Sequence, residues 1–340
     1  MTDEARLARF PRARLGHWPT PLQRADRLRD AIGGPTVWLK RDDCTGLAFG
    51  GNKTRKLEFL LGEALAKGAD TVVTVGALQS NHARQTAAAC AHLGLRCELV
   101  LCRLVDRTDD HYLRSGNRLL DDLLGANVHV VDTPGEQAAL VDQLAAEATA
   151  DGRTLYRIPG GGSDEVGLLG YVAAARELAE QAATIGVDLR RVVVAASTAG
   201  TAAGLVLGGR LLATEGRHAP SVDIACVLAP AAETDEVLRP LLASGAARLG
   251  IADPGDEGWS MTDRTLGAGY GIPSDATLAA VSLLARTEGV LLDPVYTGKA
   301  FEHLVRAITD GELDTSADVA FLHTGGAPGL FAYTNAFTPA

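Results

Sequence analysis

The sequence predicts an α/β protein made of two parallel-sheet domains, with helices on both faces of each sheet. Short runs rich in β-branched residues alternate along the 340 residues with longer stretches rich in alanine and leucine. The short runs are continuously apolar, which is typical of strands buried on both faces of a parallel sheet. We expect strands at residues 36–41, 70–75, 97–102, 127–131, 154–158, 191–197, 222–229 and 319–325. Residues 231–265, interrupted by proline, glycine and acidic residues, are expected to form a surface excursion.

Composition and charge argue against several classes of protein. The chain is 46% hydrophobic and 22% charged, an ordinary globular composition that allows a solid core without disulfides. A formal net charge of −10 argues against a general nucleic-acid binder, which needs a basic patch. The sequence shows neither a signal-like start nor an apolar run of about 18 residues, so we expect a soluble cytoplasmic protein that does not enter a membrane. Five cysteines without a C-x-x-C pair fit neither a disulfide framework nor a zinc site, and no metal is expected.

Three of the expected strands are followed by a short polar turn and then a helix. Such a turn directs free backbone N–H groups and the positive end of the helix dipole toward the carboxyl ends of the strands, where an anion can bind. Residues 197–201, Ser-Thr-Ala-Gly-Thr, have the hydroxyls and glycine expected around a phosphate. Residues 79–82, Gln-Ser-Asn-His, are better suited to a carboxylate or a ring substituent. Taken singly, each turn is also explained as an ordinary helix cap, but the repetition favours anion sites.

Lys53 follows two glycines and an asparagine at the expected start of a helix. Residues 46–54 come close to the phosphate-binding motif G-x-x-x-x-G-K-[ST], but Asn52 separates the glycine from Lys53, which leaves an NTPase as the alternative. The positive helix end, Arg55, Lys56 and burial would each disfavour the charged form of Lys53 and make it an amine nucleophile. A nucleophilic lysine combined with a separate phosphate cup predicts pyridoxal 5′-phosphate as the cofactor.

Seven blocks of sequence, in order over roughly residues 8–333, now point to a family. They resemble the fold type II pyridoxal-phosphate enzymes of the D-cysteine desulfhydrase, L-cysteate sulfo-lyase and aminocyclopropane-carboxylate deaminase group. The resemblance implies a fold like that of the tryptophan synthase β chain. The blocks are KRDDCTGLAFGGNKTRKLEFL, GALQSNHARQTAA, IPGGGS, STAGTAAGL, GYGIP, LLDPVYTGKA and FLHTGGAPGLFAY.

The resemblance also implies roles for individual residues. In this group the lysine of GGNK forms the Schiff base with the cofactor, and the two tyrosines flank the ring and the substrate. The implied catalytic residues are Lys53, Ser80, Tyr270 and Tyr296. The implied cofactor-binding residues are Lys53, Asn81, Ser197, Thr198, Ala199, Gly200, Thr201 and Thr324. The implied substrate-binding residues are Ser80, Asn81, His82 and Thr297.

Two threonines distinguish the activities of the group. The ring-opening deaminases that this chain resembles carry a glutamate after the second tyrosine and a leucine in the HxGG block, where this chain has Thr297 and Thr324. A neutral hydroxyl would not hold the pyridine nitrogen protonated as a carboxylate would, so the pair favours β-elimination over ring opening. We expect a 3-sulfur-substituted alanine to lose its sulfur group and yield pyruvate and ammonia, with Lys53 taking the Cα proton.

The motifs leave the substrate open. CTGLA, SNHARQ and IPGGGS resemble the cysteate lyases, whereas YTGKA and HTGGAP resemble the desulfhydrases. The expectation is a D-cysteine desulfhydrase-like lyase that releases sulfide. The alternatives are an L-cysteate sulfo-lyase that releases sulfite, an aminocyclopropane-carboxylate deaminase and, outside the enzymes, a silent binding protein of the same fold.

The expected domains follow from the same resemblance. Residues 1–54 and 164–340 would form the large cofactor-binding domain and residues 55–163 the small one. The cofactor should lie in the cleft between them, at the carboxyl ends of the strands. The expected partners are a small amino-acid substrate and a second copy of the chain in a homodimer.

Overall fold

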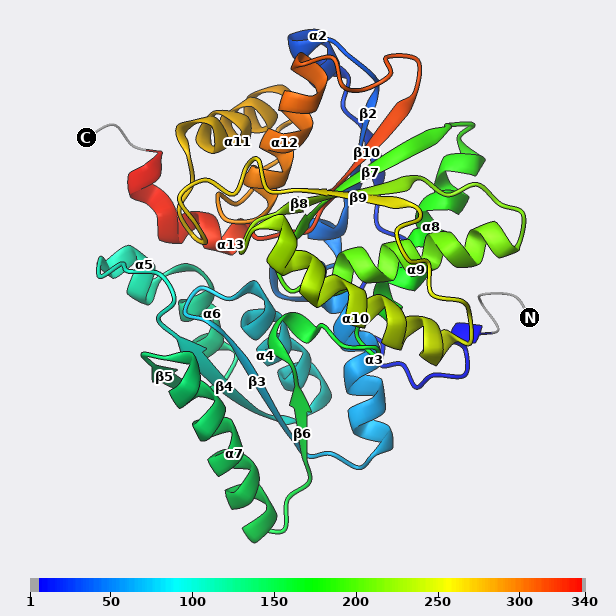
Figure 1. Ribbon diagram of the computed structural model, residues 1–340. Helices are drawn as coiled ribbons and strands as arrows, with labels where there is room; N and C mark the ends of the chain where they lie inside the picture. The colour runs from blue at the N-terminus through cyan, green and yellow to red at the C-terminus, as the bar shows by residue number, and fades with distance from the viewer. Residues whose placement is uncertain (1–5, 338–340) are drawn as a thin grey trace.

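A computed structural model describes residues 6–337 and contains two β-sheets (Figure 1). The large sheet has the strand order β1-β2-β10-β7-β8-β9, and the small sheet has the order β5-β4-β3-β6. All neighbouring strands run parallel except β1 and β2. The strands are β1 (Leu22–Arg24), β2 (Val37–Arg41), β3 (Thr71–Ala77), β4 (Arg96–Cys102), β5 (Asn127–Val131), β6 (Leu155–Ile158), β7 (Leu189–Ala196), β8 (Ser221–Cys226), β9 (Trp259–Thr262) and β10 (Asp318–His323).

Each of the eight expected strands is present to within three residues of its expected bounds. Two strands, β1 and β9, were not expected, because three or four residues at a sheet edge are too few to show a period. The expectation for residues 231–265 is wrong. These residues form a 19-residue helix with a proline in its interior and then the edge strand β9.

Helices cover both faces of each sheet, as the sequence predicts. In the large sheet, both α9 and α12 contact β7 and β8; α8 and α10 pack on α9, and α11 packs on α12. In the small sheet, α4 and α7 both contact β3 and β4. The helices are α2 (Asp26–Ile32), α3 (Lys53–Ala66), α4 (Asn81–Leu93), α5 (Asp110–Arg114), α6 (Gly116–Leu123), α7 (Pro134–Ala150), α8 (Leu169–Thr184), α9 (Gly200–Thr214), α10 (Ala231–Leu249), α11 (Asp275–Glu288), α12 (Thr297–Thr309) and α13 (Ala327–Leu330), with the 3₁₀ turns η1 (Asp42–Cys44), η2 (Leu47–Phe49), η3 (Gly160–Gly162) and η4 (Phe331–Ala336).

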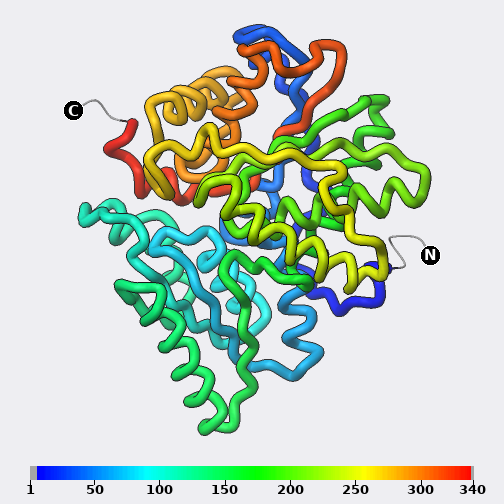
Figure 2. Tube along the Cα trace, in the orientation of Figure 1, coloured from blue at the N-terminus to red at the C-terminus, as the bar shows by residue number. Residues whose placement is uncertain are grey.

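The chain crosses between the two sheets. Strands β2 and β10, from opposite ends of the sequence, lie side by side in the large sheet, whereas the four strands of the small sheet all fall within residues 71–158 (Figure 2). A large cluster of buried apolar side chains extends from the small sheet through α3 and α8 to one face of the large sheet. The two sheets therefore share core contacts along α3. The exact domain boundaries stay a prediction. No helix within residues 6–337 combines the length and apolar character needed to cross a bilayer.

A buried ionic network attaches the start of α3 to the large sheet. The Arg55 guanidinium donates to both carboxylate oxygens of Asp42, at 2.8 and 2.9 Å, and to Glu177 at 2.8 Å. Lys40 also donates to Glu177, and Arg55, Lys40 and Asp42 are almost fully buried. Burial is the largest single influence and disfavours the ionised Asp42, but the charges of Arg55 and Lys40 and the hydrogen bonds from Arg55 and Tyr171 together outweigh it, so the pKa of Asp42 is lowered. This network fixes the helix whose first residue is Lys53.

Replacing Asp42 with asparagine should strongly destabilise the fold. The change leaves the Arg55 guanidinium buried with only part of its charge compensated, and breaking a buried pair typically costs about 3–5 kcal/mol. The exposed Arg103–Asp132 pair offers a matched control, since Asp132→Asn should cost less than about 1 kcal/mol. Urea unfolding of the three proteins measures both values. Equal, small losses in both variants would contradict a stabilising role for the network.

Candidate active site

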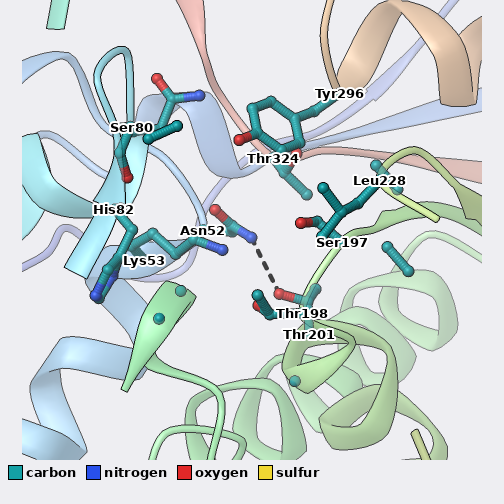
Figure 3. A pocket seen from close by; sticks show the side chains of 18 of the residues that line it. Asn52, Lys53, Ser80, His82, Ser197, Thr198, Thr201, Leu228, Tyr296 and Thr324 are labelled. Atoms are coloured by element: carbon teal, nitrogen blue, oxygen red, sulfur yellow. Dashed lines mark hydrogen bonds between the residues drawn. The ribbon is translucent and has the colours of Figure 1, made fainter. Parts of the chain in front are cut away.

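One cavity lies where the carboxyl ends of strands from both sheets meet (Figure 3). Lys53, Ser80 and His82 lie on one side of it, Ser197, Thr198 and Thr201 on the other, and Tyr296 and Thr324 close a third side. The cavity thus brings together all but one of the residues that the resemblance implies. Those that line it are Lys53, Ser80, Asn81, His82, Ser197, Thr198, Ala199, Gly200, Thr201, Tyr270, Tyr296 and Thr324.

Lys53 presents a poorly solvated amine to this cavity. It is the first residue of α3, and burial lowers the pKa of its amine to about 8. Within residues 6–337, no hydrogen bond or ion pair involves this amine. The expectation that Arg55 lowers this pKa is wrong, because the Arg55 charge is directed to Asp42 and Glu177. Burial alone explains the shift.

Asn52, the residue that interrupts the phosphate-loop motif, connects three parts of the site. Its side chain donates from Nδ2 to Thr201 Oγ1 at 3.0 Å, and its backbone N–H donates to the Thr324 carbonyl at 2.9 Å. Asn52 therefore ties the start of α3 to the start of α9 and to the end of β10. In the sequence, Asn52 shows only as a departure from a motif, which does not predict that it connects these elements.

Residues 197–201 form a turn at the start of α9 with the features of an anion cup. Ala199 adopts a left-handed conformation with φ of +53°, and the Gly200 N–H donates to Thr198 O at 2.7 Å. A Cβ atom on Gly200 would lie 2.6 Å from Ser163 Oγ and 2.8 Å from Lys56 Nζ. Gly200 is required here because any larger residue would place its Cβ too close to these two polar atoms.

Lys56 and Ser163 complete the cup and were not predicted as site residues. Lys56 Nζ donates to Gly161 O and to Ser163 Oγ, both at 2.8 Å, and Ser163 Oγ lies 2.6 Å from Thr198 Oγ1. Burial, followed by the charge of Lys53, lowers the pKa of Lys56 well below its usual value. The sequence signal was the spacing of three residues from Lys53, which places both lysines on one face of α3.

Ser80 and Asn81 start helix α4 at the opposite wall. Ser80 Oγ accepts the Ala83 N–H at 3.1 Å as a helix cap, which leaves its own O–H available to the cavity. The Asn81 Oδ1 atom accepts from Asn117 Nδ2 at 2.9 Å, so the NH₂ group of Asn81 is left as its free donor. Asn117 lies 36 residues away in sequence, and no motif indicated it.

His82 is held as a neutral imidazole. The Thr74 hydroxyl donates to the Ile158 carbonyl at 2.9 Å, so it accepts from His82 Nε2 at 2.8 Å. Burial and then the charges of Lys53 and Lys56 lower the pKa of His82 well below its usual value. In this neutral tautomer the proton lies on Nε2, so Nδ1 can only accept a hydrogen bond and the ring carries no positive charge.

Tyr270 and Tyr296 form a pair through their hydroxyl groups. The two phenol oxygens are hydrogen-bonded, and the rings meet edge to face with centroids 5.8 Å apart. Burial raises the pKa of both phenols above the usual value. Both tyrosines therefore remain neutral near physiological pH and can serve as hydrogen-bond donors or acceptors rather than as bases.

The two threonines are placed differently. Thr324 lines the cavity, whereas Thr297 does not. The Thr297 hydroxyl donates to Asp293 Oδ1 at 2.6 Å, and the same buried carboxylate accepts the backbone N–H groups of Tyr296 and Thr297. Thr297 therefore lies outside the cavity lining, and its hydroxyl is already engaged by Asp293. Its side chain belongs to the turn that holds Tyr296.

Comparison with known proteins identifies the family. The sequence profile described as "Pyridoxal-phosphate dependent enzyme" matches residues 13–325. The chain belongs to this family. Pyridoxal phosphate is accordingly its cofactor. D-cysteine desulfhydrases of Salmonella choleraesuis (strain SC-B67) and Salmonella schwarzengrund (strain CVM19633) are 44% and 43% identical to this family member over 327 residues, 96% of this chain and 97% of theirs.

Solved structures confirm the predicted fold of this pyridoxal-phosphate enzyme. The crystal structure of an ACC (aminocyclopropane-carboxylate) deaminase homologue superimposes with a TM-score of 0.88 at 38% identity and covers 98% of both chains. The crystal structure of a T.th. threonine deaminase has a TM-score of 0.62 at 21% identity over 90% of this chain and 92% of its own, which is a similarity of fold alone. The fold is type II, as the resemblance implies.

The residues present fit the cofactor. A carbonyl-reactive amine needs a lysine that is neutral near physiological pH, and Lys53 meets that need. A phosphate needs backbone N–H groups, hydroxyls and further N–H donors, and the cup offers these through residues 197–201 and the Lys56 amine.

Lys53 should react with acetic anhydride at a lower pH than an ordinary lysine. Only the neutral amine reacts, so labelling of the cofactor-free protein should rise about tenfold per pH unit and level off above pH 8, whereas an ordinary lysine titrates near ~10.4. Peptide mass spectrometry after brief labelling at pH 6 to 11 measures the profile. A midpoint near 10 at Lys53 would show that the amine is well solvated.

Proposed function

We propose that the protein is a carbon–sulfur lyase that releases sulfide from D-cysteine and leaves pyruvate and ammonia. The observation that carries this proposal is the 44% identity to a D-cysteine desulfhydrase over 96% of the chain. The cavity supports it, because Lys53, the cup and Ser80 all face the same space. Bound pyridoxal phosphate supplies an electron sink for the Cα of an amino acid.

The proposed binding roles follow from the free polar groups. Lys53 would hold the cofactor covalently, and residues 197–201 with Lys56 would hold its phosphate. The NH₂ group of Asn81, left free by Asn117, would donate to the ring oxygen. Thr324 would offer a neutral hydroxyl to the pyridine nitrogen, and Ser80 would donate its free O–H to the substrate carboxylate. His82 would line the same wall and offer only the acceptor Nδ1 to the substrate.

Proton transfer is proposed to depend on Lys53. With a pKa of about 8, its amine is neutral in a useful fraction near physiological pH and can accept the Cα proton once the substrate has displaced it. The raised pKa of both Tyr270 and Tyr296 makes them poor bases, so their proposed role is to orient substrate and leaving group.

The charge of the cavity favours a thiol over a sulfonate substrate. Among the described lining residues, Lys53 and Lys56 are the cationic side chains. Both have a lowered pKa, and Lys56 already donates to Gly161 and Ser163 beside the phosphate cup. L-Cysteate carries an additional sulfonate charge, which needs a further cation or several N–H donors. We therefore propose a sulfide-releasing rather than a sulfite-releasing lyase.

The same wall of the cavity disfavours ring opening. No carboxylate lines the cavity in the described part of the chain, and the position facing the proposed pyridine site is the neutral Thr324. Opening a cyclopropane at an unactivated carbon requires a ring nitrogen that stays protonated. The described cavity has no carboxylate that would keep it protonated. The nearby Asp293 carboxylate is fully occupied by Val295, Tyr296 and Thr297.

A substrate panel tests this function. We expect pyruvate and sulfide from D-cysteine, and almost no keto acid from L-cysteate or aminocyclopropane-carboxylate. The assays are keto acid, sulfide and sulfite, with L-cysteine, 3-chloro-D-alanine and D-serine in the same panel. Sulfite from L-cysteate would instead establish the sulfo-lyase, and 2-oxobutanoate would establish ring opening. A protein that binds the cofactor but turns over none of these compounds would support the silent binding protein.

Lys53→Ala should abolish turnover without unfolding the protein. The substitution removes the amine but leaves the cup, so the variant should still bind pyridoxal phosphate noncovalently while losing the absorbance of the lysine-bound form. Lys67→Ala is the matched control, because Lys67 lies at the other end of α3 and pairs with Glu63 on the surface. Pyruvate release by Lys53→Ala at more than a trace rate would contradict its role as the base.

We also propose that the enzyme works in the cytoplasm as a homodimer. Four of its five cysteines are buried free thiols, which suits a reducing compartment. The dimer is supported by the family resemblance and by large exposed apolar side chains such as Phe49 and Leu123, which are 67% and 72% exposed. Elution at the monomer size at micromolar concentration would contradict the dimer.

A further inference from the structure

Lys299 has an unusual environment beside the tyrosine pair. It lies in the first turn of α12, its side chain is fully buried, and its Nζ donates to Leu266 O at 2.6 Å and to Gly269 O at 2.7 Å. The two carbonyls belong to the segment that carries Tyr270. The ammonium group is thus bound by backbone dipoles of this segment.

The segment that Lys299 holds, residues 263–273, has its other side-chain anchors at its N-terminal end, where Asp263 accepts the Ala231 N–H and Arg264 reaches α12. Gly267, Gly269 and Gly271 have φ of +66°, +138° and +73°, conformations that other residues rarely adopt. Its internal backbone hydrogen bonds are Leu266 N–H to Asp263 O and a longer one of 3.3 Å from Ile272 N–H to Gly269 O. A glycine-rich segment loses much conformational entropy on ordering, so its anchors decide where Tyr270 lies.

Residues at the start of α12 and in the turn before it hold both members of the tyrosine pair in place. Tyr296 immediately precedes the helix and is fixed by its backbone N–H bond of 2.8 Å to Asp293. Tyr270 is fixed from the same helix through Lys299, because Gly269 is its neighbour in the chain. The hydrogen bond between the two phenols therefore depends on one lysine that is in contact with neither ring oxygen.

Lys299 is not explained as a counter-ion. The nearest carboxylates are satisfied by other groups: Glu302 pairs with Arg306 at 2.7 Å, and Asp293 accepts the Thr297 hydroxyl. A second cation, Arg264, also ties α12 to the segment, but it reaches Glu312 and the His303 carbonyl at the far end from Tyr270.

We propose that Lys299 is a positioning residue that holds residues 263–273 against α12 so that the Tyr270 hydroxyl reaches Tyr296. Removing the ammonium takes the Lys299 hydrogen bond from the Leu266 carbonyl and leaves the Gly269 carbonyl with only the long bond from Ile272 N–H, in a segment rich in glycine. The catalytic consequence rests on the lyase function proposed above, whereas the effect on the segment does not.

Hydrogen exchange of the holoenzyme tests the structural part. Lys299→Met should accelerate exchange in a peptide covering residues 263–273 and leave the other peptides unchanged. Arg306→Met is the matched control, since it removes a cation from the same helix without touching the segment. Unchanged exchange in residues 263–273, or faster exchange throughout the protein, would overturn the proposal.

A double-mutant cycle tests the catalytic part. Misplacing an orienting group by about 1 Å can reduce turnover about 10²-fold, which is the loss expected in kcat for Lys299→Met with D-cysteine. In a Tyr270→Phe background the same change should cost less than about threefold, because the hydroxyl it positions is already gone. Methylammonium should partly restore kcat in Lys299→Ala by occupying the same two carbonyls. If Lys299→Met reduced kcat by the same factor with and without the Tyr270 hydroxyl, the proposal would be overturned. If the protein turns over no substrate, the hydrogen-exchange measurement still decides the structural part.

Discussion

The chemistry proposed for the cavity depends on the amine of Lys53, which is poorly solvated and has no hydrogen-bond partner within residues 6–337. The chain has five lysines, and four of them are engaged: Lys40 with Glu177, Lys56 with Gly161 and Ser163, Lys67 with Glu63, and Lys299 with two backbone carbonyls. Burying a charged amine without a partner is costly, so its pKa falls and the neutral form is favoured instead. The neutral form is the one in which an amine reacts with a carbonyl, as proposed for Lys53.

The surrounding fold can be understood as what maintains this environment. The buried network of Asp42, Arg55 and Glu177 takes up the positive charge that follows Lys53 on α3 and anchors the helix to the large sheet. Asn52 then joins the start of α3 to the turn at residues 197–201 and to the end of β10. Asn52, before Lys53, thus holds the start of α3 to two walls of the cavity, and Arg55, after Lys53, holds it to the large sheet.

Much of the fold and site could be predicted because the relevant signals are local. Continuous apolar runs predicted eight of the strands, and only the short edge strands β1 and β9 were missed. Polar turns that follow strands predicted that Ser80 and the cup at residues 197–201 belong to the site. The contacts that were missed are tertiary: Asn117 reaches Asn81 across 36 residues, and Ser163 meets Thr198 from another element. Thr297 was assigned to the cavity from its place in a motif, but the burial of Asp293 beside it claims its hydroxyl. Sequence position alone does not reveal which of two neighbouring groups satisfies a buried carboxylate.

The point of covalent attachment is the most direct test of a nucleophilic Lys53. The purified protein, loaded with pyridoxal phosphate and reduced with borohydride, would be digested and mapped by mass spectrometry. We expect the reduced cofactor on the peptide that contains Lys53 and on no peptide containing another of the five lysines. Attachment at Lys56 or Lys299, or a protein that binds the cofactor without attachment to any lysine, would contradict the assignment of Lys53.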